Sequence, residues 1–111
     1  MDLNFFKQAR VLDGGMGQEL LARGMKPNGT LWSANAILND NYHQLLLDTH
    51  RDFVKAGAEV IVTTTFTTRR KRLKENNIED KFEYLNKKAG EIAQEVKKEF
   101  PKIFIAGGLP P

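Results

Sequence analysis

Three short apolar segments separated by helical segments restrict this chain to few folds. The apolar segments are residues 9–12, 60–66 and 103–106. Strands joined by helical crossovers pair in parallel, with right-handed connections. The middle segment, rich in Val and Thr, has no helical period, which is typical of a strand covered on both faces. The sequence therefore predicts an α/β fold built from βαβ units.

Apolar spacing predicts three helices, over residues 17–23, 40–56 and 78–100. Gly24 is expected to end the first helix in a left-handed conformation, and Gly57 lies just past the second. Pro101 stops the third helix. Residues 25–35, rich in Gly, Pro, Asn, Thr and Ser, predict a loop.

Composition fits one folding unit over residues 1–111. The 111 residues are 41% hydrophobic and 28% charged, enough to form a core, and no linker or repeat divides them. The net charge of +3 is too small to indicate nucleic acid binding by itself. The absence of cysteine excludes a disulfide framework and removes the thiolate ligands of most structural zinc sites. Neither a signal peptide nor a membrane span is expected, so we predict a cytoplasmic protein without membrane partners.

Polar and glycine residues follow each predicted strand. The first strand leads into Asp13, Gly14 and Gly15, the second ends near Thr65 and Phe66, and the third leads into Gly107 and Gly108. In parallel α/β folds the carboxyl ends of the strands share one edge, and ligands bind there. The alternative is that these residues only form the turns that strand ends require.

Asp13 suggests the chemistry of such a ligand. A carboxylate beside the amides of Gly14 and Gly15 suits an amino acid zwitterion, with the ammonium on Asp13 and the carboxylate on the amides. Alternatively, Asp13 caps the short helix that follows it. These residues alone predict a small polar ligand.

Four motifs allow a narrower interpretation. "VLDGGMGQELLARG", "LWSANAILND", "HRDFVKAGAEVIVTTTF" and "IAGGLPP" occur in an order and spacing that resemble the N-terminal part of the homocysteine S-methyltransferase family. The resemblance covers residues 10–111. It implies part of a (β/α)₈ barrel that transfers a methyl group from a small donor, such as S-methylmethionine, betaine or a methylfolate, to the thiol of homocysteine, forming methionine.

The resemblance also implies roles for individual residues. Asp13 would hold the substrate ammonium and Trp32 would lie near the reacting centre. The other substrate-binding positions that it implies are Gly14, Gly15, Thr65, Phe66, Gly107 and Gly108. In the family a zinc ion held by cysteines binds the thiol, and this chain has no cysteine. The resemblance therefore implies a methyltransferase, but no metal ligand and no catalytic residue within this segment.

A barrel of this type takes about 250 residues and eight strands, so the chain is expected to be its first three βα units. An open sheet edge predicts self-association or a complementary C-terminal half. We expect no methyltransferase turnover from these residues alone. The alternatives are an amino-acid-binding module without the chemistry and, less favoured, a small basic protein that binds nucleic acid.

The basic residues 69–74 are expected to form a solvated, poorly ordered surface, with docking of an anionic donor or of nucleic acid phosphates as the alternative. His43 and His50 are expected to be packed or solvent-facing and not metal ligands.

Overall fold

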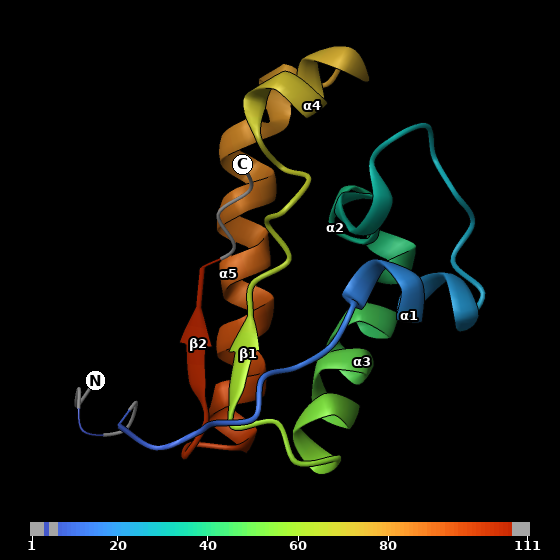
Figure 1. Cartoon of the computed structure of the whole chain (residues 1–111). Helices are drawn as coiled ribbons and strands as arrows, with labels where there is room; N and C mark the ends of the chain where they lie inside the picture. The colour runs from blue at the N-terminus through green and yellow to red at the C-terminus, as the bar shows by residue number, and fades with distance from the viewer. Residues whose placement is uncertain (1–3, 5–6, 108–111) are drawn as a thin grey trace.

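The computed structural model describes residue 4 and residues 7–107 and contains a small parallel sheet. Strand β1 (Val60–Val62) pairs in parallel with β2 (Phe104–Ala106), with Val60 opposite Phe104. On the other side of β1, an isolated parallel bridge joins Leu12 to Val60. Figure 1 shows the two strands side by side, with helix α5 running along them. The predicted α/β class and the parallel pairing are confirmed.

The strands are shorter than predicted. Residues 9–12 form a single bridge at Leu12 and no regular strand. The backbone hydrogen bonds of this segment to the β1 region include Glu59 N to Val11 O at 2.8 Å and Asp13 N to Val60 O at 3.1 Å. Strand β1 ends at Val62 instead of reaching residue 66. Beyond it the chain turns sharply, with Thr65 N donating to Thr63 O at 2.8 Å.

The three predicted helices are confirmed within a few residues. They are α1 (Met16–Ala22), α3 (His43–Lys55) and α5 (Phe82–Glu99). Single 3₁₀ turns precede the two long ones: η3 (Asp40–Tyr42) before α3, and η4 (Glu79–Lys81) before α5. None of these helices is long and apolar enough to cross a bilayer, and neither is any other helix within the described residues.

Gly24 ends α1 as predicted. Its φ is +106°, a conformation that glycine adopts without the steric cost a side chain brings. Beyond it, Met25 N donates to Leu20 O at 3.0 Å, and both Met25 and Leu20 are buried. This hydrogen bond and the apolar contact between the same residues are the features of a Schellman cap. The cap turns the chain back over the core.

Two predictions about irregular segments were wrong. Within the expected loop 25–35, a 3₁₀ turn η2 (Trp32–Ala34) runs into helix α2 (Asn35–Leu38). The basic segment 69–74, expected to be poorly ordered, contributes most of helix α4 (Arg70–Glu75), although Arg70, Lys71 and Lys74 are exposed as a solvated surface requires. Both helices are ordered by burial that composition does not reveal: Asn35, Ala36 and Ile37 of α2 and Leu73 of α4 are buried. Tertiary packing therefore overrides the weak local propensity of these short helices.

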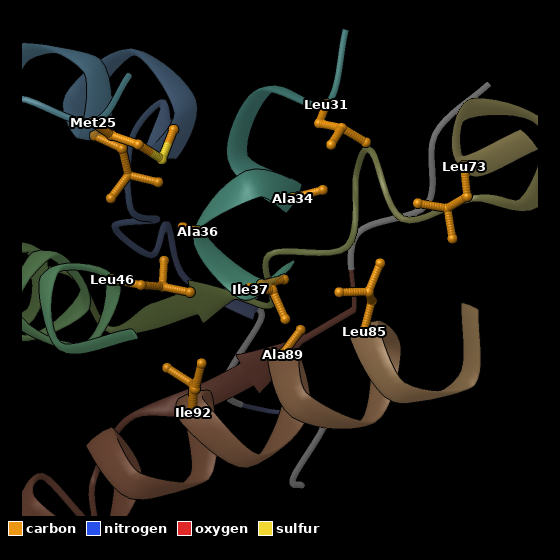
Figure 2. Close-up of a cluster of buried hydrophobic side chains, with 11 residues drawn as sticks. Met25, Leu31, Ala34, Ala36, Ile37, Leu46, Leu73, Leu85, Ala89 and Ile92 are labelled. Carbon is orange, nitrogen blue, oxygen red and sulfur yellow. The ribbon is translucent and has the colours of Figure 1, made fainter. Parts of the chain in front are cut away.

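The main core lies between the helices, away from the two strands. Figure 2 shows Leu46 of α3, Ile37 of α2 and Leu85 of α5 converging on one cluster. A second, smaller cluster joins the sheet to α5, and its members are Ile61, Ala93, Val96 and Ile103. The sheet is thereby fixed against α5.

Candidate substrate pocket

A pocket of about 550 Å³ lies where the Leu12 segment and β1 end. Five of the predicted site residues line it: Asp13, Gly14, Gly15, Trp32 and Phe66. They come from three separate segments, the turn before α1, the turn η2 and the loop after β1. The structure therefore brings these five residues together, at the sheet edge where ligands bind in parallel α/β folds.

Three predicted residues do not join them. Thr65 follows β1 but does not line the pocket, where Thr63, Thr64 and Thr67 lie instead. Its hydroxyl lies 3.1 Å from the hydroxyl of Thr63 within the sharp turn. Gly107 is exposed and lies outside the pocket lining, and Gly108 lies outside the described residues. The early end of β1 explains why Thr63 and Thr64 occupy the place expected of Thr65.

Asp13 is held against the sheet. Val62 N donates to Asp13 Oδ2 at 3.0 Å. The carboxylate thus accepts the hydrogen bond that a backbone carbonyl would accept if the ladder continued. Helix α1 has Gly15 as its N-cap and no side-chain cap bond, so Asp13 does not cap it. Burial raises the pKa of the Asp13 carboxyl above its ordinary value, although the Val62 amide opposes this rise. A bound cation would lower that pKa again, and a half-buried carboxylate therefore favours a cationic partner.

Trp32 forms one wall of the pocket in an unusual conformation. Its φ is +51°, a left-handed value that is uncommon for any residue with a side chain, and 53% of the residue is exposed. A large apolar side chain held this way, at a site open to solvent, is typical of functional positions. Phe66, 54% exposed, lines the same pocket. The two rings give the pocket an apolar, aromatic surface.

Buried threonines fix these two aromatic residues. Thr67 Oγ1 donates to Leu31 O at 2.5 Å and accepts from Ala34 N at 3.1 Å, so it spans the turn that carries Trp32. The neighbouring Thr68 hydroxyl donates to Asn86 Oδ1 of α5 at 2.7 Å. Both threonines are buried. The loop after β1 is thereby tied to η2 on one side and to α5 on the other.

Arg72 is a pocket residue that sequence reasoning missed. It belongs to α4, and its Nη1 donates to Thr30 O at 2.7 Å. The members of the basic segment differ: Arg70 lies over the ring of Phe82, 4.1 Å from its centroid, and Arg72 lines the pocket. No sequence signal separates the two, because the distinction depends on where the loop at Thr30 passes.

His50 lies beneath the pocket. It is fully buried in α3, with Nε2 3.5 Å from the hydroxyl of the pocket residue Thr64. Burial lowers the pKa of His50 to about 4, so its imidazole is neutral at pH 7. His43 Nε2 donates to Ile37 O at 2.7 Å. Each histidine was expected to be packed or solvent-facing, and His50 is packed whereas His43 is half-buried.

The chain's own residues do not fit a metal site. Within the described residues no three His, Cys, Asp or Glu side chains gather closely enough to hold a metal ion, and the sequence contains no cysteine. The Nδ1 atom of His50 is buried without a hydrogen-bond partner, but a single imidazole does not make a metal site. A metal at this pocket would need ligands from outside the described residues.

Comparison with known proteins identifies the family. The family model for homocysteine S-methyltransferase matches residues 10–111. The chain belongs to the homocysteine S-methyltransferase family. The family predicted from the four motifs is thereby confirmed.

Two relatives illustrate the match in sequence. Homocysteine S-methyltransferase 2 of Saccharomyces cerevisiae is 35% identical over 78 residues, which are 63% of this chain and 24% of the relative. Homocysteine S-methyltransferase 2 of Zea mays is 33% identical over 101 residues, 90% of this chain and 29% of the relative. The chain thus spans about a quarter of the length of these homocysteine S-methyltransferases.

The fold matches as well. The metallated form of the homocysteine methyltransferase MmuM from Escherichia coli superimposes with a TM-score of 0.80 at 26% identity. The match covers 97% of this chain and 40% of the solved structure. Nearly the whole of this chain therefore has the same fold as a part of that methyltransferase.

Proposed function

We propose that this chain contributes the amino-acid-binding pocket of a homocysteine S-methyltransferase, which transfers a methyl group from a small donor to the homocysteine thiol. Family membership supports the reaction class. The observation that carries the proposal is the placement of Asp13, Trp32 and Phe66 around one pocket at the sheet edge.

Asp13 would bind the substrate ammonium. Its Oδ2 is fixed by the Val62 amide, so the carboxylate is oriented before a ligand arrives. An ammonium beside the carboxylate compensates for the hydration that the carboxylate loses on burial. A charge-assisted hydrogen bond of this kind contributes about 1.5–3 kcal/mol. This contact would position the amino acid backbone and leave the sulfur-bearing side chain to the rest of the pocket.

Trp32 and Phe66 would surround the reacting groups. A relative from Rattus norvegicus, 34% identical over 99 residues, is named for S-methylmethionine as donor, and such a donor carries a positive sulfonium. Aromatic faces attract cations and exclude water. The two exposed rings would therefore bind the sulfonium and orient its methyl group, an effect of binding and orientation alone.

The chain's own residues bind and orient but do not generate a thiolate. Among the described pocket residues, Asp13 is the only carboxylate, and neither an imidazole nor an amine is present. A free thiol has a pKa near about 8.5 and is mostly protonated at neutral pH. No step from thiol to thiolate is therefore assigned to this chain, and the activating groups would come from outside it.

We also propose that the chain is the first part of a (β/α)₈ barrel. Val11 and Leu12 are 55% and 59% exposed, and the outer edge of β2 has no strand partner among the described residues. Further strands of the barrel would cover both edges. A binding module without chemistry is the second candidate, because the pocket is formed while cysteine is absent from the sequence.

Calorimetry with L-homocysteine and L-methionine tests the proposed pocket. Asp13→Asn removes the charge but keeps an oxygen that accepts from the Val62 amide, so we expect affinity to fall about tenfold or more. Asp80→Asn, at an exposed position outside the pocket, is the matched control and should leave affinity unchanged. Equal affinity of the Asp13 variant and the unchanged chain, or no binding by the unchanged chain, would refute the proposal.

A further inference from the structure

The pocket is lined by a cationic side chain, Arg72, as well as by the carboxylate of Asp13. Among its described lining residues the charged side chains are Asp13 and Arg72. Asp13 is fixed to the sheet by Val62, whereas Arg72 is fixed to a different segment by Thr30. The two charges therefore come from independent parts of the fold and line one cavity.

The guanidinium of Arg72 retains capacity for a ligand. It has five N–H donors, of which an Nη1 donor is used by Thr30 O at 2.7 Å. Its nearest carboxylate is Glu75, with Nε and Oε2 3.9 Å apart, and the Glu75 side chain is 50% exposed. A contact this long at an exposed position neutralises little of the charge. The Arg72 side chain is itself only 20% exposed, so it is held in place before a ligand binds.

The turn before α1 is a weaker place for an anion. Helix α1 has only seven residues, and the Glu19 carboxylate in its first turn is paired with Arg23, with Nε and Oε1 3.0 Å apart. The turn offers backbone amides without a cationic side chain, whereas Arg72 is the cationic side chain among the described lining residues. The geometry therefore favours the Arg72 guanidinium over the amides of Gly14 and Gly15 as the place for a carboxylate.

We propose that Arg72 binds the α-carboxylate of an amino acid substrate and so restricts this pocket to amino acids, excluding the corresponding amines. This inference rests on the proposed function. Guanidinium and carboxylate form paired, planar hydrogen bonds, which makes arginine selective for this group. The carboxylate can belong to the methyl acceptor or to an amino acid donor, and the experiment below separates these two sources.

The test measures four ligands by calorimetry. L-Methionine stands for the acceptor and S-methyl-L-methionine for the donor, and each is paired with the alcohol that replaces its carboxylate, L-methioninol and S-methyl-L-methioninol. Arg72→Gln removes the charge and keeps an amide donor for Thr30 O. Lys71→Gln is the control, because Lys71 is an exposed cation of the same helix that does not line the pocket.

We expect Arg72→Gln to weaken a carboxylate ligand about tenfold or more while the matching alcohol changes less than about twofold. Loss confined to L-methionine assigns Arg72 to the acceptor, and loss confined to S-methyl-L-methionine assigns it to the donor. Equal weakening of acid and alcohol would show that Arg72 acts only by holding the loop at Thr30, and this would overturn the inference, as would unchanged binding. If the unchanged chain binds none of the four ligands, the proposed function fails as well.

Discussion

Acidification should destabilise this chain through His50. The imidazole is completely buried, and burial lowers its pKa from 6.5 to about 4. Between these two values the unfolded chain binds a proton that the folded chain does not. The free energy of unfolding therefore increases with pH across this window and is constant above it. Stability that is fully present at pH 7 should be lost progressively as the pH falls from 6.5 towards 4.

The magnitude follows from the shift. One pKa unit corresponds to about 1.36 kcal/mol, so a shift from 6.5 to about 4 is worth about 3 kcal/mol in full. Most of this change, about 2 kcal/mol, falls between pH 7 and pH 5 because protonation of the unfolded imidazole is then nearly complete. Small domains have about 5–15 kcal/mol of stability, so the loss would be a large fraction.

Urea denaturation followed by circular dichroism at pH 7 and pH 5 measures this loss. Other groups titrate too, and Asp13, whose pKa is raised, acts in the opposite direction because its folded form binds the proton more tightly. His50→Gln and His50→Asn isolate the histidine, since each should remove about 2 kcal/mol of the pH dependence whatever its effect at pH 7. If the unchanged chain and both variants lose the same stability between these pH values, the buried neutral imidazole is not the cause.

Two further predictions concern the turn that carries Trp32. Thr67→Val, which keeps the shape but removes the hydroxyl between Leu31 O and Ala34 N, should lower the free energy of unfolding by about 1–2 kcal/mol in urea, whereas Thr67→Ser should cost less. An equal cost for the two variants would assign the effect to packing. At Trp32, with φ of +51°, the glycine variant should be more stable than the alanine variant by about 0.5–1 kcal/mol, the reverse of the usual order. Both should weaken L-methionine binding in calorimetry if the ring forms the pocket wall.

Local sequence determined the elements that have a repeated apolar spacing, a glycine at the helix end or a fixed order along the chain. The apolar periods of α3 and α5 extend over many residues, and Gly24 adopts the φ of +106° that suits a helix end. The order of apolar segments and helices also required parallel pairing, which the register of β1 and β2 shows. These features depend on interactions between residues close in sequence or on chain connectivity, so they are visible without a structure.

Only the tertiary structure decided where strands end and which side chains share the pocket. The ladder between β1 and the Leu12 segment ends at Val62, whose amide donates to the carboxylate of Asp13, a residue distant in sequence. Pairing with β2 reaches Thr63, whose amide donates to Ala106 O, before the turn at Thr65 begins. Helices α2 and α4 are too short to form by propensity, and they are ordered by burial of Ile37 and Leu73. Asp13 follows a predicted strand, so its place at the ligand-binding edge could be predicted from the sequence. The place of Arg72 in the pocket could not, because it depends on a contact with the distant loop at Thr30. Local periodicity carries no information about such long-range contacts.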